Sequence, residues 1–230
     1  MRRFATVIVG ILSLSVAVGV AGAALRFPQV PVAGGSLQGY LNGVGESINV
    51  LTDQNAAQTW ASTVSGNATF TLQIELAGNA AANTIGLYNG GLAVPPLYQV
   101  FPGAATNGWF AVASFRNSPI RVIVNLFDNN ANPVGNNTYL GADRNNFGYY
   151  LSGPGGTFYT QDARNAGSAA QALTYAGTGV NVGSWWLCWE DLRVGGGADL
   201  DYEDAVLFLE SVNPTPVHRS SWGQLKARFR

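Results

Sequence analysis

A dense group of carboxylates near the C-terminal end offers the clearest chemistry in this sequence. Six of the thirteen acidic residues lie between positions 190 and 204, where Arg193 is the only basic residue. Two like charges about 4 Å apart repel by about 4 kcal/mol at an effective dielectric constant of about 20. A loop that gathers such charges therefore needs a counter-charge, and a hard divalent cation would supply it.

The spacing of these carboxylates favours calcium. In the pattern D-x-D-x-x-D, which begins at Asp199, the first two side chains project to the same side of an extended segment. Three glycines at 195–197 allow the backbone to fold back toward the end of the preceding strand. The pattern departs from that of an EF-hand, and a solvated acidic hairpin loop is the alternative. We predict a structural calcium site whose ligands are Glu190, Asp191, Asp199, Asp201 and Asp204.

The sequence gives little support for catalysis. The single histidine, His218, lies beside Arg219 and far along the chain from any candidate nucleophile. A glycoside hydrolase could use two of the clustered carboxylates, but its general acid needs an apolar pocket to hold a proton. We expect these carboxylates to lie in a hydrophilic glycine loop instead. We therefore expect a protein that is not an enzyme, and we expect Cys188, among tryptophans, to be a buried apolar side chain.

The N-terminal segment has the pattern of a secretory signal peptide. Two arginines precede an uncharged run, and small residues at 21–23 suit cleavage before Ala24. An uncleaved anchor is the alternative, because the apolar run approaches the length that spans a bilayer. No later segment is long and apolar enough to span. We predict residues 1–23 to be a signal peptide of a secreted bacterial protein, extracellular or at the outer cell surface.

Composition and patterning predict a single all-β domain. Only 11% of the residues are charged and no basic stripe exists, so we do not expect nucleic acid as a partner. One cysteine excludes an internal disulfide framework. Short segments with alternating apolar residues, bounded by Gly, Asn or Pro, predict an antiparallel β-sandwich of jelly-roll or related type around one core. We expect this domain at 37–213, after a flexible lead at 24–36. The expected strands span residues 46–52, 58–63, 68–76, 84–88, 98–101, 108–115, 120–128, 146–151, 157–160, 170–175, 184–190 and 204–212.

Two of these expected strands have similar sequences, which we call the internal echo. The segment at 83–88 reads NTIGLY, and the segment at 145–150 reads NNFGYY. The echo is consistent with a duplicated strand pair that faces across the sandwich, although turn chemistry alone also produces such likeness.

Aromatic residues and the C-terminal tail raise two further possibilities. Exposed aromatics would stack on sugar rings, which makes a carbohydrate-binding module the alternative function, although strand alternation places most of them in the core. Residues 214–230 read as a Pro-containing linker and a short amphipathic tail, which suits a sorting signal, a partner-docking helix or a cap on the sandwich. The aromatic candidates are Trp60, Trp109, Tyr149 and Tyr159, and the tail candidates are Trp222, Leu225, Lys226 and Phe229.

Motifs along most of the chain resemble one known family. They read NFGYYL at 146–151, GTFYTQ at 156–161, WWLCWEDL at 185–192 and GGGADLDYEDAV at 195–206. Over residues 37–217 the chain resembles the domain of unknown function 4114, found in secreted bacterial proteins that often carry a PEP-CTERM sorting tail. The resemblance implies a β-rich extracellular domain without established catalysis and a calcium motif at the five carboxylates named above. Glu203 stands where the family often has a small polar residue, and the end of this chain departs from the family's sorting tail.

Taken together, the sequence predicts a surface or extracellular-matrix protein with a structural or adhesive role. A surface glycan or a matrix protein is the expected kind of partner, and calcium is the expected cofactor.

Overall fold

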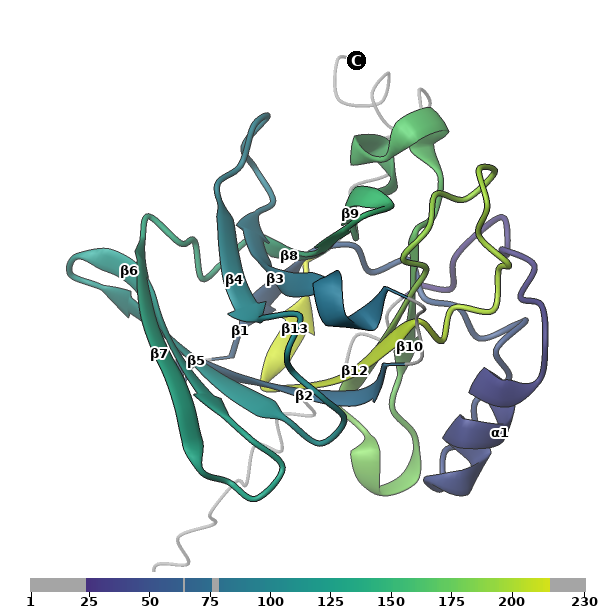
Figure 1. The fold of residues 1–230 in the computed structure, drawn as a ribbon, viewed down its shortest axis with the longest axis horizontal. Coiled ribbons are helices and arrows are strands. Elements are labelled where there is room, and N and C mark those ends of the chain that lie inside the picture. The colour runs from purple at the N-terminus through teal and green to yellow at the C-terminus, as the bar shows by residue number, and fades with distance from the viewer. Residues whose placement is uncertain (1–23, 64, 76–78, 216–230) are drawn as a thin grey trace, which may run out of the picture.

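The computed structural model of the chain describes residues 24–63, 65–75 and 79–215 (Figure 1). The predicted signal peptide lies outside these residues, and so do His218 and the four tail candidates Trp222, Leu225, Lys226 and Phe229. Within the described part of the chain, no helix has the length and apolar character needed to cross a membrane.

Two antiparallel sheets pack against each other and form an all-β sandwich, as the sequence predicts. One sheet has the strand order β10-β11-β12-β2-β5-β6-β7, and the other has the order β13-β1-β8-β3-β4 with β9 paired to β8. The strands of the first, seven-stranded sheet are β2 (Asn67–Glu75), β5 (Phe110–Asn117), β6 (Ile120–Phe127), β7 (Pro133–Leu140), β10 (Ala172–Ala176), β11 (Trp185–Trp189) and β12 (Ala205–Glu210). Those of the second, six-stranded sheet are β1 (Trp60–Ser62), β3 (Thr84–Asn89), β4 (Leu97–Phe101), β8 (Phe147–Gly153), β9 (Gly156–Tyr159) and β13 (Val212–Pro214).

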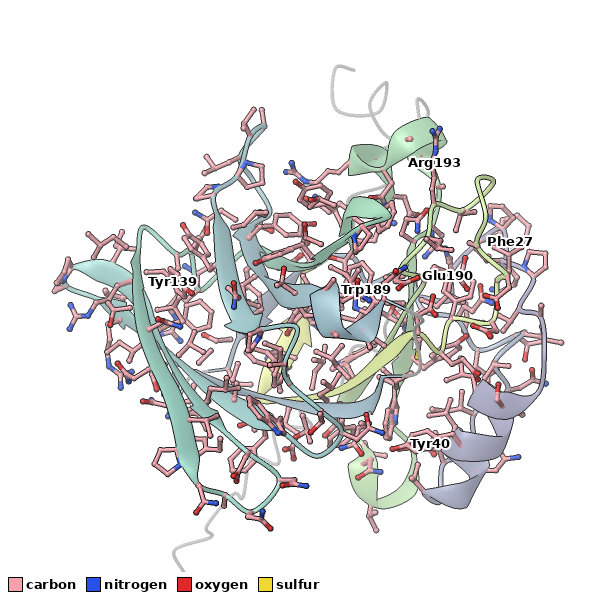
Figure 2. All side chains as sticks on the ribbon, viewed as in Figure 1. Phe27, Tyr40, Tyr139, Trp189, Glu190 and Arg193 are labelled. Atoms are coloured by element: carbon pink, nitrogen blue, oxygen red, sulfur yellow. The ribbon has the colours of Figure 1, made fainter. Side chains whose placement is uncertain are left out.

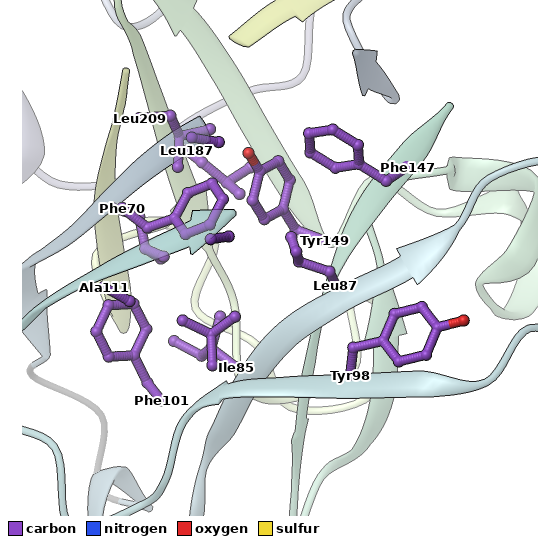
Figure 3. Packing of buried hydrophobic residues seen from close by; sticks show 14 of the residues in the cluster. Phe70, Ile85, Leu87, Tyr98, Phe101, Ala111, Phe147, Tyr149, Leu187 and Leu209 are labelled. Atoms are coloured by element: carbon purple, nitrogen blue, oxygen red, sulfur yellow. The ribbon is translucent and has the colours of Figure 1, made fainter. Parts of the chain in front are cut away.

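The main core fills the space between the two sheets. Strand β6 shows the expected alternation, because Val122 and Val124 are buried whereas Ile123 between them is only half-buried. Phe70 from β2 and Tyr149 from β8 meet edge to face with their ring centroids 5.4 Å apart. Figure 3 shows how side chains from both sheets converge in this core.

A second core lies on the outer face of the seven-stranded sheet, where we expected one core only. It is covered by residues 24–52, which we call the N-terminal layer and which contain the helix α1 (Ser36–Gly43). Figure 1 places α1 beside β10 and β12, at the opposite end of the molecule from β6 and β7. The buried members of the second core are Leu37, Leu41, Ile48, Val50, Ala170, Leu173, Tyr175, Trp186, Cys188, Tyr202 and Val206.

The N-terminal layer accounts for two differences from the sequence-based expectation. Residues 46–52 do not form the expected strand, because Asn49 accepts backbone hydrogen bonds from Thr52 and Asp53 and turns the chain. Residues 24–36, expected to be a flexible lead, are bonded to the domain: Leu25 bridges Asn55, and the Ala33 amide donates to the Leu200 carbonyl at 2.7 Å.

Helix α1 and strand β7 are among the elements that the sequence did not predict. Helix α1 contains two glycines and has no side-chain cap, so its stability comes from burial of Leu37 and Leu41 one turn apart. Strand β7 contains Gly135 and two asparagines, which are poor strand formers, and it forms by pairing with β6. Four short 3-10 helices complete the described structure, at Ala80–Ala82, Asp162–Arg164, Ala166–Ser168 and Gly179–Asn181.

The internal echo in the sequence corresponds to two neighbouring strands of one sheet, not to strands that face each other across the sandwich. Strands β3 and β8 pair antiparallel, with Gly86 opposite Tyr150 and Tyr88 opposite Gly148. A Cβ atom at Gly148 would lie 2.3 Å from the Tyr88 ring, and one at Gly86 would lie 2.7 Å from the Tyr150 ring. Each tyrosine therefore occupies the space that a side chain on the opposite glycine would need.

Candidate metal centre

The acidic cluster lies in the loop that connects β11 to β12. These strands pair antiparallel, and Trp189 at the end of β11 stands opposite Ala205 at the start of β12. Glu190 and Asp204 are the next residues on each side, so strand pairing alone brings the two ends of the acidic loop together. The sequence places the remaining carboxylates between these two points.

Left-handed backbone conformations shape the loop. Leu200 has a φ of 66° and Tyr202 has a φ of 56°, in a region that costs an L-residue about 1–2 kcal/mol. Both side chains pack in the second core, and the Tyr202 hydroxyl donates to the Ala170 carbonyl at 2.8 Å. Packing of these two residues thus offsets the backbone cost, while Asp199 and Asp201 alternate with them and stay outside the core.

Three carboxylates come together at this place. Carboxylate oxygens of Glu190, Asp199 and Asp201 lie within 4.8 Å of one another, and this group could hold a metal ion. Glu190 is 0% exposed, Asp201 is half-buried and Asp199 is exposed. The site therefore has a buried floor and an open side toward solvent, through which an ion could enter.

Glu190 has one satisfied and one unsatisfied oxygen. Its Oε1 accepts a hydrogen bond from the Tyr202 amide at 2.8 Å, whereas its Oε2 is buried without a hydrogen-bond partner. An isolated buried carboxylate oxygen is costly unless it is paired or coordinates a metal. The donor set is made of oxygen atoms only, which suits a hard cation.

The electrostatics of the cluster favour a cation. Burial, together with the nearby Asp204, Asp199 and Asp201, raises the pKa of Glu190 to about 7. Burial likewise raises the pKa of Asp204 to about 6, with further contributions from neighbouring carboxylates, and it raises the pKa of Asp201 and of Glu203. In the described part of the chain, no Lys or Arg forms an ion pair with this cluster, and Figure 2 shows Arg193 well apart from Glu190.

The other two predicted ligands, Asp191 and Asp204, form hydrogen bonds at the base of the loop. The Asp204 carboxylate accepts a hydrogen bond from the Asp191 amide at 2.8 Å. Asp191 is buried, and its Oδ2 accepts a hydrogen bond from the Asn83 side chain at 3.0 Å. The structure thus brings together Glu190 and two of the predicted aspartates, whereas Asp191 and Asp204 support the loop through hydrogen bonds.

Two supporting residues were missed in the sequence. Gln171 is buried, and its side chain accepts from the Val194 amide at 2.6 Å and donates to the Leu192 carbonyl at 2.9 Å. Asn83 directly precedes β3 of the six-stranded sheet, and its side chain donates a hydrogen bond to Asp191. Neither residue carries a recognisable motif, because each is brought to the loop by tertiary structure.

The aromatic candidates for sugar stacking do not form one surface. The expectation of exposure is wrong for Trp60 and Tyr149, which are buried in the main core with ring centroids 4.9 Å apart. Trp109 and Tyr159 are half-buried, and they belong to different sheets, next to β5 and at the end of β9. Cys188 is buried as expected, and burial raises the pKa of its thiol.

The fold and the site define an antiparallel β-sandwich with a carboxylate cluster that could hold a metal ion. Comparison with models of protein families, with curated proteins and with solved structures gave no match. The resemblance to the domain of unknown function 4114 stays a prediction from the sequence.

Proposed function

We propose that this chain is a secreted, non-enzymatic bacterial surface or extracellular-matrix protein, in which a structural calcium ion binds to Glu190, Asp199 and Asp201. The observation that carries the proposal is the state of Glu190. Its side chain is 0% exposed, its Oε2 has no hydrogen-bond partner, and two further carboxylates lie within 4.8 Å. A divalent cation would satisfy this oxygen and neutralise the repulsion among the three groups.

Calcium fits the geometry of the cluster. Calcium–oxygen distances of about 2.3–2.6 Å allow ligand oxygens on opposite sides of the ion to lie about 5 Å apart. Three oxygens within 4.8 Å of one another therefore fit around one calcium ion. Magnesium needs shorter distances of about 2.0–2.1 Å and a nearly regular octahedron, so a loop of carboxylates suits calcium, whose coordination is more flexible, better.

The ion would join the end of β11 to the loop that precedes β12, since Glu190 directly follows β11 and both aspartates lie in that loop. An ion that binds only the folded chain stabilises it by about 2.7 kcal/mol at a hundredfold excess over its Kd. A structural or adhesive role is consistent with this stabilisation, with the predicted export and with the low charge of the chain. A surface glycan or a matrix protein would be the partner.

Calorimetric titration of the intact, chelator-treated chain with calcium, and in parallel with magnesium, tests the proposal. We expect one calcium site that Asp201→Asn weakens at least tenfold. Glu210→Gln is the matched control, because it removes one exposed negative charge at the far end of β12. Absence of calcium binding, or equal affinity in Asp201→Asn and the parent chain, would refute the proposed site.

A further inference from the structure

The N-terminal layer covers an apolar sheet face that would otherwise meet water. Strand β11 is buried along its whole length: Leu187 faces the main core, whereas Trp186 and Cys188 face the second core. Apolar residues on both faces are typical of a strand that is covered on both sides. In the described structure, the layer covers this outer face of β10, β11 and β12 together with Leu200 and Tyr202 of the acidic loop.

The main core contains no residue of the layer. The buried residues between the two sheets form a cluster of their own, and none of them comes from residues 24–52. Local opening with a free energy below that of global unfolding is common for units with separate contacts. The second core therefore has the separate contacts that a local opening requires.

The N-terminal layer also contacts the acidic loop between β11 and β12. The carbonyl of Leu200 accepts a hydrogen bond from the Ala33 amide at 2.7 Å, and the Leu200 side chain packs against the second core. The next residue, Asp201, lies beside Gly34, where an added Cβ would be 3.8 Å from the Asp201 Cβ. The same short segment therefore supplies two carboxylates to the metal site and a docking point to the layer.

Tyr202 forms a second link between the metal site and the second core. Its amide donates to Glu190 Oε1, and its ring is buried in the second core next to residues of the layer. Movement of the segment at 199–202 away from Glu190 would withdraw Leu200 and Tyr202 from that core. The layer also has anchors outside this loop: Arg26 forms an ion pair with Asp162, and Glu46 accepts hydrogen bonds from the side chains of Asn181 and Trp186 at 2.7 and 2.8 Å.

We propose that an ion bound to Glu190, Asp199 and Asp201 holds the N-terminal layer closed over the second core, and that loss of the ion opens this layer while the sandwich remains folded. The inference rests on the proposed function, because it needs an ion at this site. The metal site would then have a regulatory role, because the bound ion would control whether the apolar outer face of the seven-stranded sheet is exposed to solvent.

Cys188 provides a direct probe of the opening. It is the single cysteine of the chain, it is 0% exposed, and it lies in the second core beneath the layer. Alkylation of its thiol in the native protein therefore requires the layer to open. If opening destroys the ion site, calcium slows alkylation by a factor of 1 + [Ca²⁺]/Kd, which is about 100-fold at a hundredfold excess over Kd.

The measurement is the alkylation rate of Cys188 in the intact chain by mass spectrometry, as a function of free calcium. We expect the rate to fall by half at the Kd found by calorimetry. Amide hydrogen exchange of β5 and β6, measured in the same samples, reports whether the main sandwich stays folded. We expect this exchange to change far less than the alkylation rate when the ion is removed.

Two matched glycine variants test the link from the layer to the ion without touching a carboxylate. Gly34 has a φ of 79° next to Asp201, and Gly141 has the same φ of 79° directly after β7, where its amide donates to the Ile120 carbonyl. Alanine is strained at both positions. Because coupling is reciprocal, we expect Gly34→Ala to speed alkylation in calcium and to weaken calcium binding, and Gly141→Ala to change neither.

Each outcome bears on a different claim. Calcium binding without any effect on Cys188 alkylation would overturn the closure of the layer and leave the metal site intact. Equal acceleration of alkylation and of β5–β6 exchange after ion removal would mean global unfolding, and would overturn the inference as well. No calcium binding by calorimetry would overturn both the site and the inference.

Discussion

Replacement of Glu190 by glutamine separates the cost of the buried carboxylate from its benefit to ion binding. Burial and nearby carboxylates raise the Glu190 pKa from its ordinary value of 4.5 to about 7. At about 1.4 kcal/mol per pKa unit, the charged side chain destabilises the ion-free fold by about 3 kcal/mol at pH 8. Glutamine has nearly the same shape and no charge, so it removes this cost.

The sign of the effect depends on pH and on calcium. A carboxyl group with a raised pKa in the folded state binds its proton more tightly there, so stability falls as the pH rises from 4.5 to about 7. In chelator, we expect Glu190→Gln to be more stable than the parent chain by up to about 3 kcal/mol at pH 8, and equally stable near pH 4. In calcium at a hundredfold excess over Kd, the parent gains about 2.7 kcal/mol and the variant does not.

Urea unfolding of the intact chain at both pH values, in chelator and in calcium, provides the assay. Glu210→Gln is the control, because Glu210 is exposed and stands apart from the loop. A variant that is less stable than the parent at pH 8 in chelator would contradict the cost assigned to the buried carboxylate. A variant that gains as much from calcium as the parent would contradict the role of Glu190 as a ligand.

Three further substitutions have defined outcomes in urea unfolding at neutral pH. Glu46→Gln should lower the free energy of unfolding by about 1–3 kcal/mol, because a buried carboxylate that accepts several hydrogen bonds loses its charge. The pKa of Glu46 is lowered in the folded chain, so the difference in stability between variant and parent should shrink as the pH falls through that pKa. Gly148→Ala should cost at least about 1–3 kcal/mol, because its Cβ would lie 2.3 Å from the buried Tyr88 ring. Gly155→Ala should both destabilise the chain and weaken calcium binding in calorimetry, because its Cβ would lie 2.2 Å from the Asp191 carbonyl oxygen and push the base of the loop.

The sequence predicted the features whose causes are local. Alternation in β6 and the turn residues around the short strands gave the antiparallel sandwich, because strand periodicity is readable over a few residues. The acidic cluster was also local, since Glu190 and Asp201 lie only eleven positions apart on either side of a glycine turn. Pairing of β11 with β12 then brings the two ends of the acidic loop together, as the spacing of the carboxylates suggested.

The features that depend on distant contacts could not be predicted in this way. Asn83, directly before β3 of the other sheet, donates a hydrogen bond to one oxygen of Asp191, and nothing in the sequence indicates this contact. Helix α1 forms because the outer face of β11 offers it an apolar surface, not because its own residues favour a helix. A signal for that cover was present, since all five residues of β11 are apolar, which is typical of a strand buried on both faces.

The paired glycines and tyrosines of β3 and β8 have a consequence for how the chain finds its fold. These strands are joined by no turn, since more than fifty residues separate Asn89 from Phe147, so no hairpin geometry sets their alignment. A slip by one residue would turn every side chain to the opposite face and would bring each tyrosine against a residue with a Cβ. The two glycine spaces accept the two rings in one alignment only. Shape complementarity between Gly86 and Tyr150, and between Gly148 and Tyr88, thus fixes the register of this long-range strand pair. In a hairpin, a tight turn fixes the register instead.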